Sequence, residues 1–544
     1  MFKIQAFTTL IFIALMSACG FKQEQADLVV HNAVIYSVDE NFATYQAMAI
    51  KNGEIIALGA EREILNKYSS TEFLDAKGQF VYPGFIDAHS HLFGYAQDLN
   101  NLNLIGCKSQ EELVQRLEAY LNQQQLKVVF GRGWDESTWP NAKLPQRQAI
   151  DSITPGIPVL LNRIDGHGAL ANKKALDLAG ITPSTQIEGG FIDYESGIIK
   201  ENAVDLIYQK LKPLADTSGL NMAFQKATKN CFQVGLTTVC DAGLDPEQID
   251  FYQNLAKTQN LNIRVYAMAA PNKENFSALR SSGVIKGEFF NLYAVKAYMD
   301  GSLGSRSAAL LKDYYDDPGN RGILTLSIDS LQELASICKD LGLQLNTHCI
   351  GDHALREALN VYSTVLDPNN DQRWRIEHTQ VFHPDDLDKM RKYAVIPSVQ
   401  PTHATSDEKW AAQRLGPERV KYSYAYQTLK NQLGWIPLGT DFPVEDINPL
   451  KTFCAAVFRK PLGDPEKEAF LPQEALTPED ALKGMTIWAA LSMKMEEEVG
   501  SLELGKKADF VVLNGDLLKA EASSLDKIKV QYTYLNGERK YAAY

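Results

Sequence analysis

The chain has 544 residues, a hydrophobic fraction of 45% and a formal net charge of −13. This length predicts a folded protein with two or more domains, and the ordinary apolar fraction argues against a disordered chain. The negative charge, without any block of clustered Lys and Arg, argues against nucleic acid or an anionic membrane surface as a partner, because phosphate contacts need basic side chains.

The N-terminus has the pattern of an export signal. A lysine precedes a short apolar stretch, 6–16, which is too short to span a bilayer, and small residues then lead to Cys19. This arrangement resembles the lipobox of bacterial lipoproteins, although Met16 replaces the usual Leu. The resemblance implies a signal peptide over 1–19 and a lipid on Cys19. An ordinary signal peptide cut near Ala18, or an uncleaved helix, is the alternative.

Two further expectations concern the location of the chain and the state of its cysteines. Gly20 follows the predicted lipidation site in place of the Asp that favours retention in the inner membrane. We therefore expect a lipid-anchored protein of the cell envelope, on the periplasmic face of the outer membrane. The other cysteines lie mostly inside apolar runs without framework-like clustering, which predicts buried free thiols. They are Cys107, Cys231, Cys240, Cys338, Cys349 and Cys454.

Both ends of the chain carry the alternating pattern of short β-strands. Segment 26–82 contains β-branched runs separated by turn residues, and segment 498–544 has the same texture. Neither segment has enough strands for a stable sandwich alone. The sequence therefore predicts one small β-sandwich domain assembled from both ends.

Strand and helix patterns alternate through 83–497. This spacing predicts parallel βα units and an α/β fold, which we interpret as a (β/α)8 TIM barrel. The stretch from about 100 to 201 is too long for a plain βα connection. We therefore predict an insertion after the first barrel strand, folded as a lid over the mouth of the site.

Residue types that bind metals stand at the ends of successive strand-like runs. The loops at the carboxyl end of barrel strands carry the active site, so these side chains are expected to converge. His89 and His91 are one residue apart on a strand and point the same way, so they can share one cation. The full set comprises His89, His91, Lys296, His348, His378 and Asp441.

This order of residues resembles the amidohydrolase superfamily of metal-dependent hydrolases. The Gly133-Trp134-Asp135 and Arg163-Ile164-Asp165-Gly166-His167 motifs of the insertion, with 300–306 after the lysine, resemble the YtcJ-like branch. The resemblance covers essentially the whole mature chain. It implies two divalent cations held by the set above, with zinc expected and iron or manganese as alternatives. It also implies that Lys296 reacts with CO₂ to give a carbamate that bridges the two cations.

Each ligand has a plainer alternative. An unmodified Lys296 would be a buried lysine paired with Asp300 or another carboxylate, and the site would then hold one metal. His348 and His378 could each be hydrogen-bonded core residues. Asp441 could cap the next helix.

A second group of polar residues matches the YtcJ-like pattern less firmly. His167, His403 and Arg306 are candidate catalytic residues, and either histidine could donate to a developing oxyanion. Arg163 belongs to the same group, and each could equally hold a loop in place. His353 begins the helix after His348 and is expected to support the ligands without binding metal, or to belong to the lid. Trp134 and Trp139 are expected to wall the pocket or pack the lid.

The sequence thus predicts a hydrolase that cleaves an amide-type C–N bond of a small molecule. A hydroxide bridging the two cations would be the nucleophile and Asp441 the general base. The enzyme alternative is a mononuclear deaminase of the same superfamily, although its helical His-x-x-Glu shuttle is not found. A solute-binding lipoprotein without catalysis is the alternative from another class. The substrate is not identified, and the resemblance also admits a homodimer.

Overall fold

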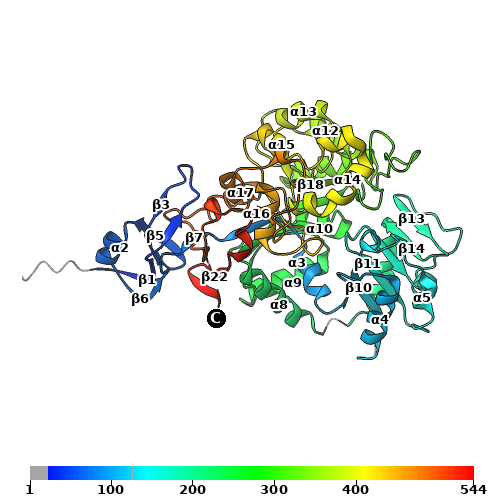
Figure 1. Cartoon of the computed structure of the whole chain (residues 1–544), viewed down its shortest axis with the longest axis horizontal. Coiled ribbons are helices and arrows are strands. Elements are labelled where there is room, and N and C mark those ends of the chain that lie inside the picture. Colours follow the sequence, from blue (N-terminus) through cyan, green and yellow to red (C-terminus); the bar gives the residue numbers. More distant parts are fainter. Residues whose placement is uncertain (1–22, 124–125, 217, 544) are drawn as a thin grey trace, which may run out of the picture.

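The computed structural model describes residues 23–123, 126–216 and 218–543. The predicted signal peptide, 1–19, and the lipidation site Cys19 lie outside these ranges and stay predictions. Within the described ranges, no helix has the length and apolar character needed to cross a bilayer. The molecule has a β-sandwich at one end, a barrel in the middle and an αβ lid at the other end (Figure 1).

Two sheets form the sandwich, and both ends of the chain contribute to it. The first sheet has the order β5 (Glu54–Gly59), β4 (Ala47–Lys51), β1 (Glu24–His31), β6 (Tyr68–Asp75). The second has the order β23 (Glu538–Ala542), β22 (Val530–Leu535), β21 (Phe510–Leu513), β7 (Phe80–Pro83), β2 (Val34–Tyr36), β3 (Thr44–Tyr45). The predicted composite sandwich is therefore confirmed.

Alternation along β1 explains how the first sheet is held. Leu28 and Val30 face the core between the two sheets, whereas Val29 packs with Ile64 of helix α2 (Glu61–Lys67) on the other side. Successive side chains of a strand point to opposite faces, so one strand serves both contacts.

The central barrel consists of seven parallel strands and one extended segment. The strand order is β20 (Ile396–Ser398), β19 (Arg375–His378), β18 (Gln344–Cys349), β17 (Phe290–Tyr298), β16 (Arg264–Ala269), β15 (Leu236–Leu244), β8 (Phe85–Ser90). Segment 436–440 fills the remaining gap, because Leu438 bridges Val399 on one side and accepts a hydrogen bond from Ala88 on the other. The predicted barrel is confirmed, with its eighth position occupied by this irregular segment.

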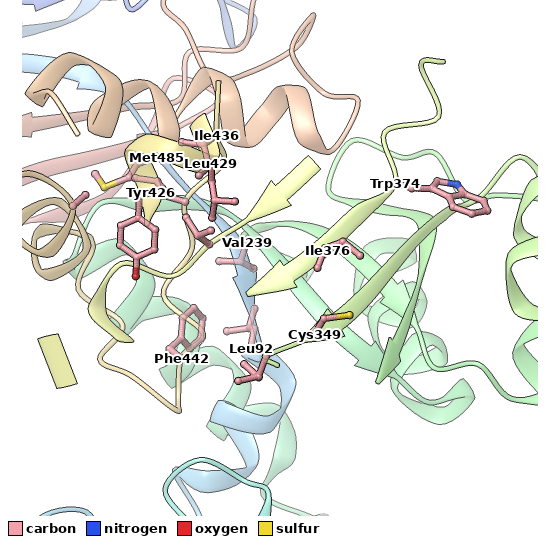
Figure 2. Close-up of a cluster of buried hydrophobic side chains, with 14 of the residues drawn as sticks. Leu92, Val239, Cys349, Trp374, Ile376, Tyr426, Leu429, Ile436, Phe442 and Met485 are labelled. Carbon is pink, nitrogen blue, oxygen red and sulfur yellow. The ribbon is translucent and has the colours of Figure 1, made fainter. Parts of the chain in front are cut away.

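The barrel helices are α3 (Leu92–Asp98), α8 (Leu220–Gln233), α9 (Pro246–Lys257), α10 (Lys273–Ser282), α11 (Ile328–Leu341), α12 (Asp352–Val365), α13 (Leu387–Lys392), α14 (Thr402–Arg419), α15 (Tyr426–Leu433), α16 (Pro449–Val457), α17 (Pro478–Gly484) and α18 (Ile487–Ser492). Their inner faces and the strands share one large apolar core. Figure 2 shows part of it, where Val239 comes from β15 and Ile376 from β19. Tyr426 and Leu429 come from α15, and Ile436 lies beside Leu429. Burial on both faces explains why the strands are apolar almost throughout.

The lid is a separate αβ unit with its own sheet. Its strand order is β13 (Gly190–Asp193), β14 (Ile198–Glu201), β12 (Gly168–Ala171), β11 (Val159–Arg163), β10 (Val129–Trp134), β9 (Leu102–Asn103). Its helices are α4 (Gln110–Leu121), α5 (Arg147–Asp151), α6 (Lys173–Leu178) and α7 (Asn202–Leu211). Trp134 and Trp139 are buried in the lid core and donate to backbone carbonyls there, so both pack the lid.

Sandwich and barrel are joined through a continuous stretch of backbone. β7 of the sandwich runs into β8 of the barrel with only Gly84 between them. A side chain at Gly84 would lie 2.3 Å from Thr237 Oγ1, so only glycine fits there without displacing the neighbouring strand. The six cysteines of the described chain are buried and free, as expected.

Candidate metal centre

The structure brings the six predicted ligand residues together at the carboxyl end of the barrel. His89, Lys296, His348 and His378 lie at or near the ends of β8, β17, β18 and β19, and Asp441 follows segment 436–440. Five of the six side chains line a cavity of about 1040 Å³ between barrel and lid, and His89 lies buried beneath its floor. The cavity also reaches His167 and His403.

His89, His91 and Asp441 form the first group of donors. Nε2 of His91 lies 3.2 Å from Asp441 Oδ1, and Nε2 of His89 lies 3.5 Å from the same oxygen. The other ring nitrogens are already committed. Nδ1 of His91 donates to the carbonyl of Ala242 at 3.1 Å, and Nδ1 of His89 donates to Glu377 Oε2 at 2.5 Å.

These contacts test whether a cation fits. A carbonyl or carboxylate oxygen only accepts, so both Nδ1 atoms must carry the proton and both Nε2 atoms of the neutral rings present lone pairs. Those lone pairs face Asp441 Oδ1, a buried oxygen without a hydrogen-bond donor in the described chain. Lone pairs and a carboxylate oxygen repel one another unless a cation lies among them, so this donor set fits a divalent metal.

A second group shares the same carboxylate. His378, His403 and Asp441 also bring one donor atom each within 4.8 Å of one another. His403 Nε2 lies 3.2 Å from Asp441 Oδ2, and His378 Nδ1 is bound to Gln400 Oε1 at 2.7 Å. The His348 ring lies beside His378, with their centroids 4.6 Å apart. The structure thus places His403 within the second group and the expected ligand His348 beside it.

Lys296 lies between the two groups and is fully buried. Its Nζ is 3.2 Å from Nε2 of His89 and 4.9 Å from the centroid of the Tyr298 ring. Burial lowers the pKa of Lys296 to about 8. A larger share of neutral amine at neutral pH favours reaction with CO₂, because only the neutral amine is nucleophilic. The alternative pairing of Lys296 with Asp300 is not found among the described residues, since that carboxylate accepts hydrogen bonds from backbone N–H groups instead.

Electrostatics keep the buried imidazoles neutral and Asp441 charged. Burial, with the charge of Lys296 second, lowers the pKa of His89 to about 4, and burial holds the pKa values of His348 and His378 well below the usual range. Burial opposes ionisation of Asp441, yet the hydrogen bond with His403 holds its pKa well below the usual range. Neutral imidazole and ionised carboxylate are the forms that bind metal.

The backbone at two of these residues has an uncommon conformation. His378 has φ 70° and Asp441 has φ 63°, both in the left-handed region. Such residues cost about 1–3 kcal/mol each and concentrate at functional sites. Asp87 holds the second one in place, because Thr440 donates to Asp87 through its hydroxyl at 2.6 Å and its N–H at 3.0 Å.

Two other predicted residues take different places. His167 lines the cavity, with Nδ1 2.8 Å from Glu201 Oε2 and its ring centroid 5.0 Å from that of His348. Burial opposes its charge, but Glu201 raises the pKa of His167 to about 9. Arg306 is not brought to the site. It pairs with Asp316 at 2.8 Å, its side chain is 34% exposed, and it does not line the cavity.

The remaining polar candidates hold loops. The guanidinium of Arg163 binds three lid carboxylates, Asp135, Glu136 and Asp165, at 2.6–2.8 Å. His353 lies on the barrel helix α12, 3.9 Å from Glu357, and it neither lines the cavity nor belongs to the lid.

Sequence reasoning missed the residues that orient the donors. Glu377, Gln400 and Asp87 each bind a donor or its neighbouring backbone. Glu377 carried a signal that could have been used. It stands two residues from Arg375 in an apolar strand, which places opposite charges on one buried face, and the two side chains do pair at 2.7 Å.

The sequence profile of the Amidohydrolase family matches residues 72–541, which include barrel and lid. The chain belongs to this family. It is 32% identical to Protein LONG AFTER FAR-RED 3 of Arabidopsis thaliana, with 95% of this chain and 92% of that protein covered. It is 27% identical to Putative amidohydrolase YtcJ of Bacillus subtilis (strain 168), covering 94% and 98%, which supports the predicted YtcJ-like branch.

Two further members are similar over most of their length. The N-substituted formamide deformylase of Arthrobacter pascens is 24% identical, with 95% of this chain and 99% of that protein covered. The crystal structure of an uncharacterized metal-dependent hydrolase from Pyrococcus horikoshii OT3 superimposes with a TM-score of 0.76 at 30% identity, covering 91% of this chain and 99% of that one. Together with the donor set, family membership makes the chain a metal-dependent hydrolase of the amidohydrolase superfamily.

Proposed function

We propose that this hydrolase cleaves the C–N bond of an amide in a small molecule, using two divalent cations. His89, His91, His348, His378 and Asp441 would hold the cations, zinc being the expected metal, and a carbamate on Lys296 would bridge them. The observation that carries the proposal is the convergence of Nε2 of His89 and of His91 on Asp441 Oδ1, an oxygen without a hydrogen-bond donor among the described residues. When bound, such cations acidify a water molecule and polarise the carbonyl under attack.

Asp441 is the proposed general base. Its carboxylate is ionised, buried and at the cavity floor, so it can take a proton from the attacking water and return it to the departing amine nitrogen. Atoms balance in this scheme. Water adds to the carbonyl carbon, the C–N bond breaks, and the acid and the amine are released.

His403 and His167 are the proposed donors to the substrate oxygen. Burial opposes the charge of His403, but Asp441 and Glu445 hold its pKa well above the usual range. The proton of His403 therefore stays available at neutral pH. Both histidines line the cavity, so either can donate to a carbonyl oxygen that gains negative charge.

The first test is metal content and the state of Lys296 in a chain that begins at Gly20. We expect two divalent metals per chain and a carbamate on Lys296, detected by elemental analysis and by mass spectrometry or crystallography. One metal with an unmodified lysine would replace the proposal by a mononuclear deaminase or hydrolase. Substrate screening should begin with N-formyl amines, given the related deformylase.

The second test removes single donors. His89→Asn and Asp441→Asn are each expected to lower kcat by at least about a thousandfold, while circular dichroism shows the fold intact. His353→Asn is the matched control, because it removes an imidazole that does not reach the cavity. Turnover retained in both donor variants would overturn the assignment.

A further inference from the structure

The cavity above the metal centre has an unbalanced charge. Apart from Lys296 at the floor, each basic side chain of the lining already has a carboxylate within 4.0 Å. A substrate carboxylate would therefore have to displace an existing ion pair to find a cation. The pairs are Arg132 with Asp98 (3.9 Å), Lys212 with Glu247 (2.7 Å), Lys409 with Asp135 (3.7 Å) and Arg163 with its three lid carboxylates.

Asp205 is the lining carboxylate that has neither a basic partner nor a hydrogen bond among the described residues. It lies in the first turn of α7, where the helix dipole favours an acid, and its side chain faces the cavity. Water reaches the side chain, but protein surrounds it on most sides, and this burial raises the pKa of Asp205 to about 6.

Tyr298 lines the same cavity from the barrel side, at the end of β17. Its side chain is 39% exposed although it lies at the end of a buried strand, because the ring opens into the cavity. Its hydroxyl has no hydrogen-bond partner in the described chain. Lys296 Nζ lies 4.9 Å from the centroid of the Tyr298 ring and the His348 ring centroid lies 5.6 Å from it, so the ring also borders the metal centre.

A carboxylate and a partly exposed aromatic ring that line the same cavity can together recognise an ammonium group. The carboxylate supplies a charge-assisted hydrogen bond, and the ring face attracts a cation. Tyr208 adds a second ring on the same wall, one turn after Asp205 on α7. Both groups lie in the cavity that opens on the metal centre, within reach of a substrate whose amide is at the floor.

We infer that the preferred substrates are amides carrying a positively charged amine, seated between Asp205 and Tyr298, and that amides carrying a free carboxylate are rejected. This inference rests on the proposed function and names the substrate class for the same site. Charge, rather than apolar size, is then the property that this cavity selects.

The test uses three amides of matched length and the metal-loaded chain. An N-formyl diaminoalkane carries an ammonium group, an N-formyl alkylamine is neutral, and an N-formyl amino acid with a terminal carboxyl carries a negative charge. We expect kcat/KM for the ammonium compound to exceed that for the neutral one by about tenfold, with the carboxylate compound lowest. A neutral or anionic preference would overturn the inference.

Two variants locate the preference. Asp205→Asn and Tyr298→Leu are each expected to lower the ammonium-to-neutral ratio of kcat/KM, Asp205→Asn by about tenfold. Glu118→Gln removes one negative charge from an exposed face of α4, outside the cavity, and is expected to keep the ratio. An unchanged ratio in both cavity variants, each shown to be folded, would overturn the inference.

Binding separates this inference from the proposed function. If none of the three amides is hydrolysed, the proposed amide hydrolysis fails, and calorimetry with a diaminoalkane still tests the cavity. Binding of the diaminoalkane by the native chain but not by Asp205→Asn, with no binding of a diol of equal length, supports an ammonium site. Equal binding of diamine and diol would overturn it.

Discussion

One buried carboxylate organises the centre at the scale of single residues. Glu377 accepts a hydrogen bond from Nδ1 of His89 at 2.5 Å and forms an ion pair with Arg375 at 2.7 Å. All three side chains are fully buried. Burial opposes ionisation, but Arg375 and His89 hold the pKa of Glu377 down at about 2. The carboxylate thereby fixes the tautomer and the direction of His89, and partners of this kind raise the basicity of a ligating imidazole.

Glu377→Gln is expected to weaken metal binding by about 10- to 100-fold, since the amide keeps the shape of the contact but loses its charge. Competition with a chelator, at a temperature where the variant is folded, measures this change. Glu357→Gln on α12 is the control, because that carboxylate is outside the cavity lining. Unchanged metal affinity would show that the tautomer of His89 is set by something other than Glu377.

At the scale of elements, one side chain, Arg163, links the loops that follow two neighbouring strands of the lid. Arg163 ends β11 and binds Asp135 and Glu136, which follow β10, as well as Asp165 in its own loop. Asp165 in turn accepts a hydrogen bond from Ser302 of the barrel at 2.9 Å. The loops that face the metal centre are thus tied to each other and to the barrel by charge.

Arg163→Met is expected to destabilise the lid by about 3 kcal/mol, because three partly buried carboxylates lose their shared cation. Hydrogen exchange should rise in the 131–137 segment while barrel segments serve as the internal reference. Arg116→Met removes a partly exposed i,i+4 pair on α4 and should change exchange little. Protection that stays the same in 131–137 would mean that the apolar lid core alone holds these loops.

Features that depend on neighbouring residues could be predicted from the sequence, whereas contacts between segments far apart in the sequence could not. The barrel strands and the sandwich were predictable because apolar periodicity is local, and His89 and His91 were placed by their strand. The contacts of Asp87 with Thr440 and of His403 with Asp441 join distant segments, so no local pattern shows them. Arg306 was predicted as a catalytic candidate for the same reason, since the motif does not reveal that its side chain pairs with Asp316 outside the cavity.

Barrel and sandwich are joined at the scale of the whole molecule by a buried ion pair as well as by the β7–β8 backbone. Arg264, at the start of β16, lies 3.0 Å from Asp509 and donates to Asn536 at 2.9 Å. Its side chain is fully buried, and it also contacts the carbonyl of Glu288. The C-terminal part of the sandwich is therefore held to the barrel by charge in a place that water does not reach.

Arg264→Leu is expected to lower the free energy of unfolding by about 3–5 kcal/mol, because the buried carboxylate of Asp509 loses its cation and keeps only the N–H of Asn536. Urea unfolding measures the loss. The double variant with Asp509→Leu should recover part of it, since no unpaired charge then remains. A midpoint that does not move in the single variant would show that the junction is carried by backbone pairing alone.

The pairing of β7 with β21 also determines when, relative to translation, the second sheet of the sandwich can form. Tyr82 lies opposite Val511, so the second sheet of the sandwich gains its central partner only after nearly the whole chain has left the ribosome. At a translation rate of about 5–20 residues per second, this edge of β7 stays without its partner β21 for roughly twenty seconds to more than a minute. During that interval the nascent protein presents an unpaired strand edge, the feature that most readily recruits another chain. Production of the protein should therefore depend on chaperone capacity and on translation speed more than the stability of the finished fold would suggest.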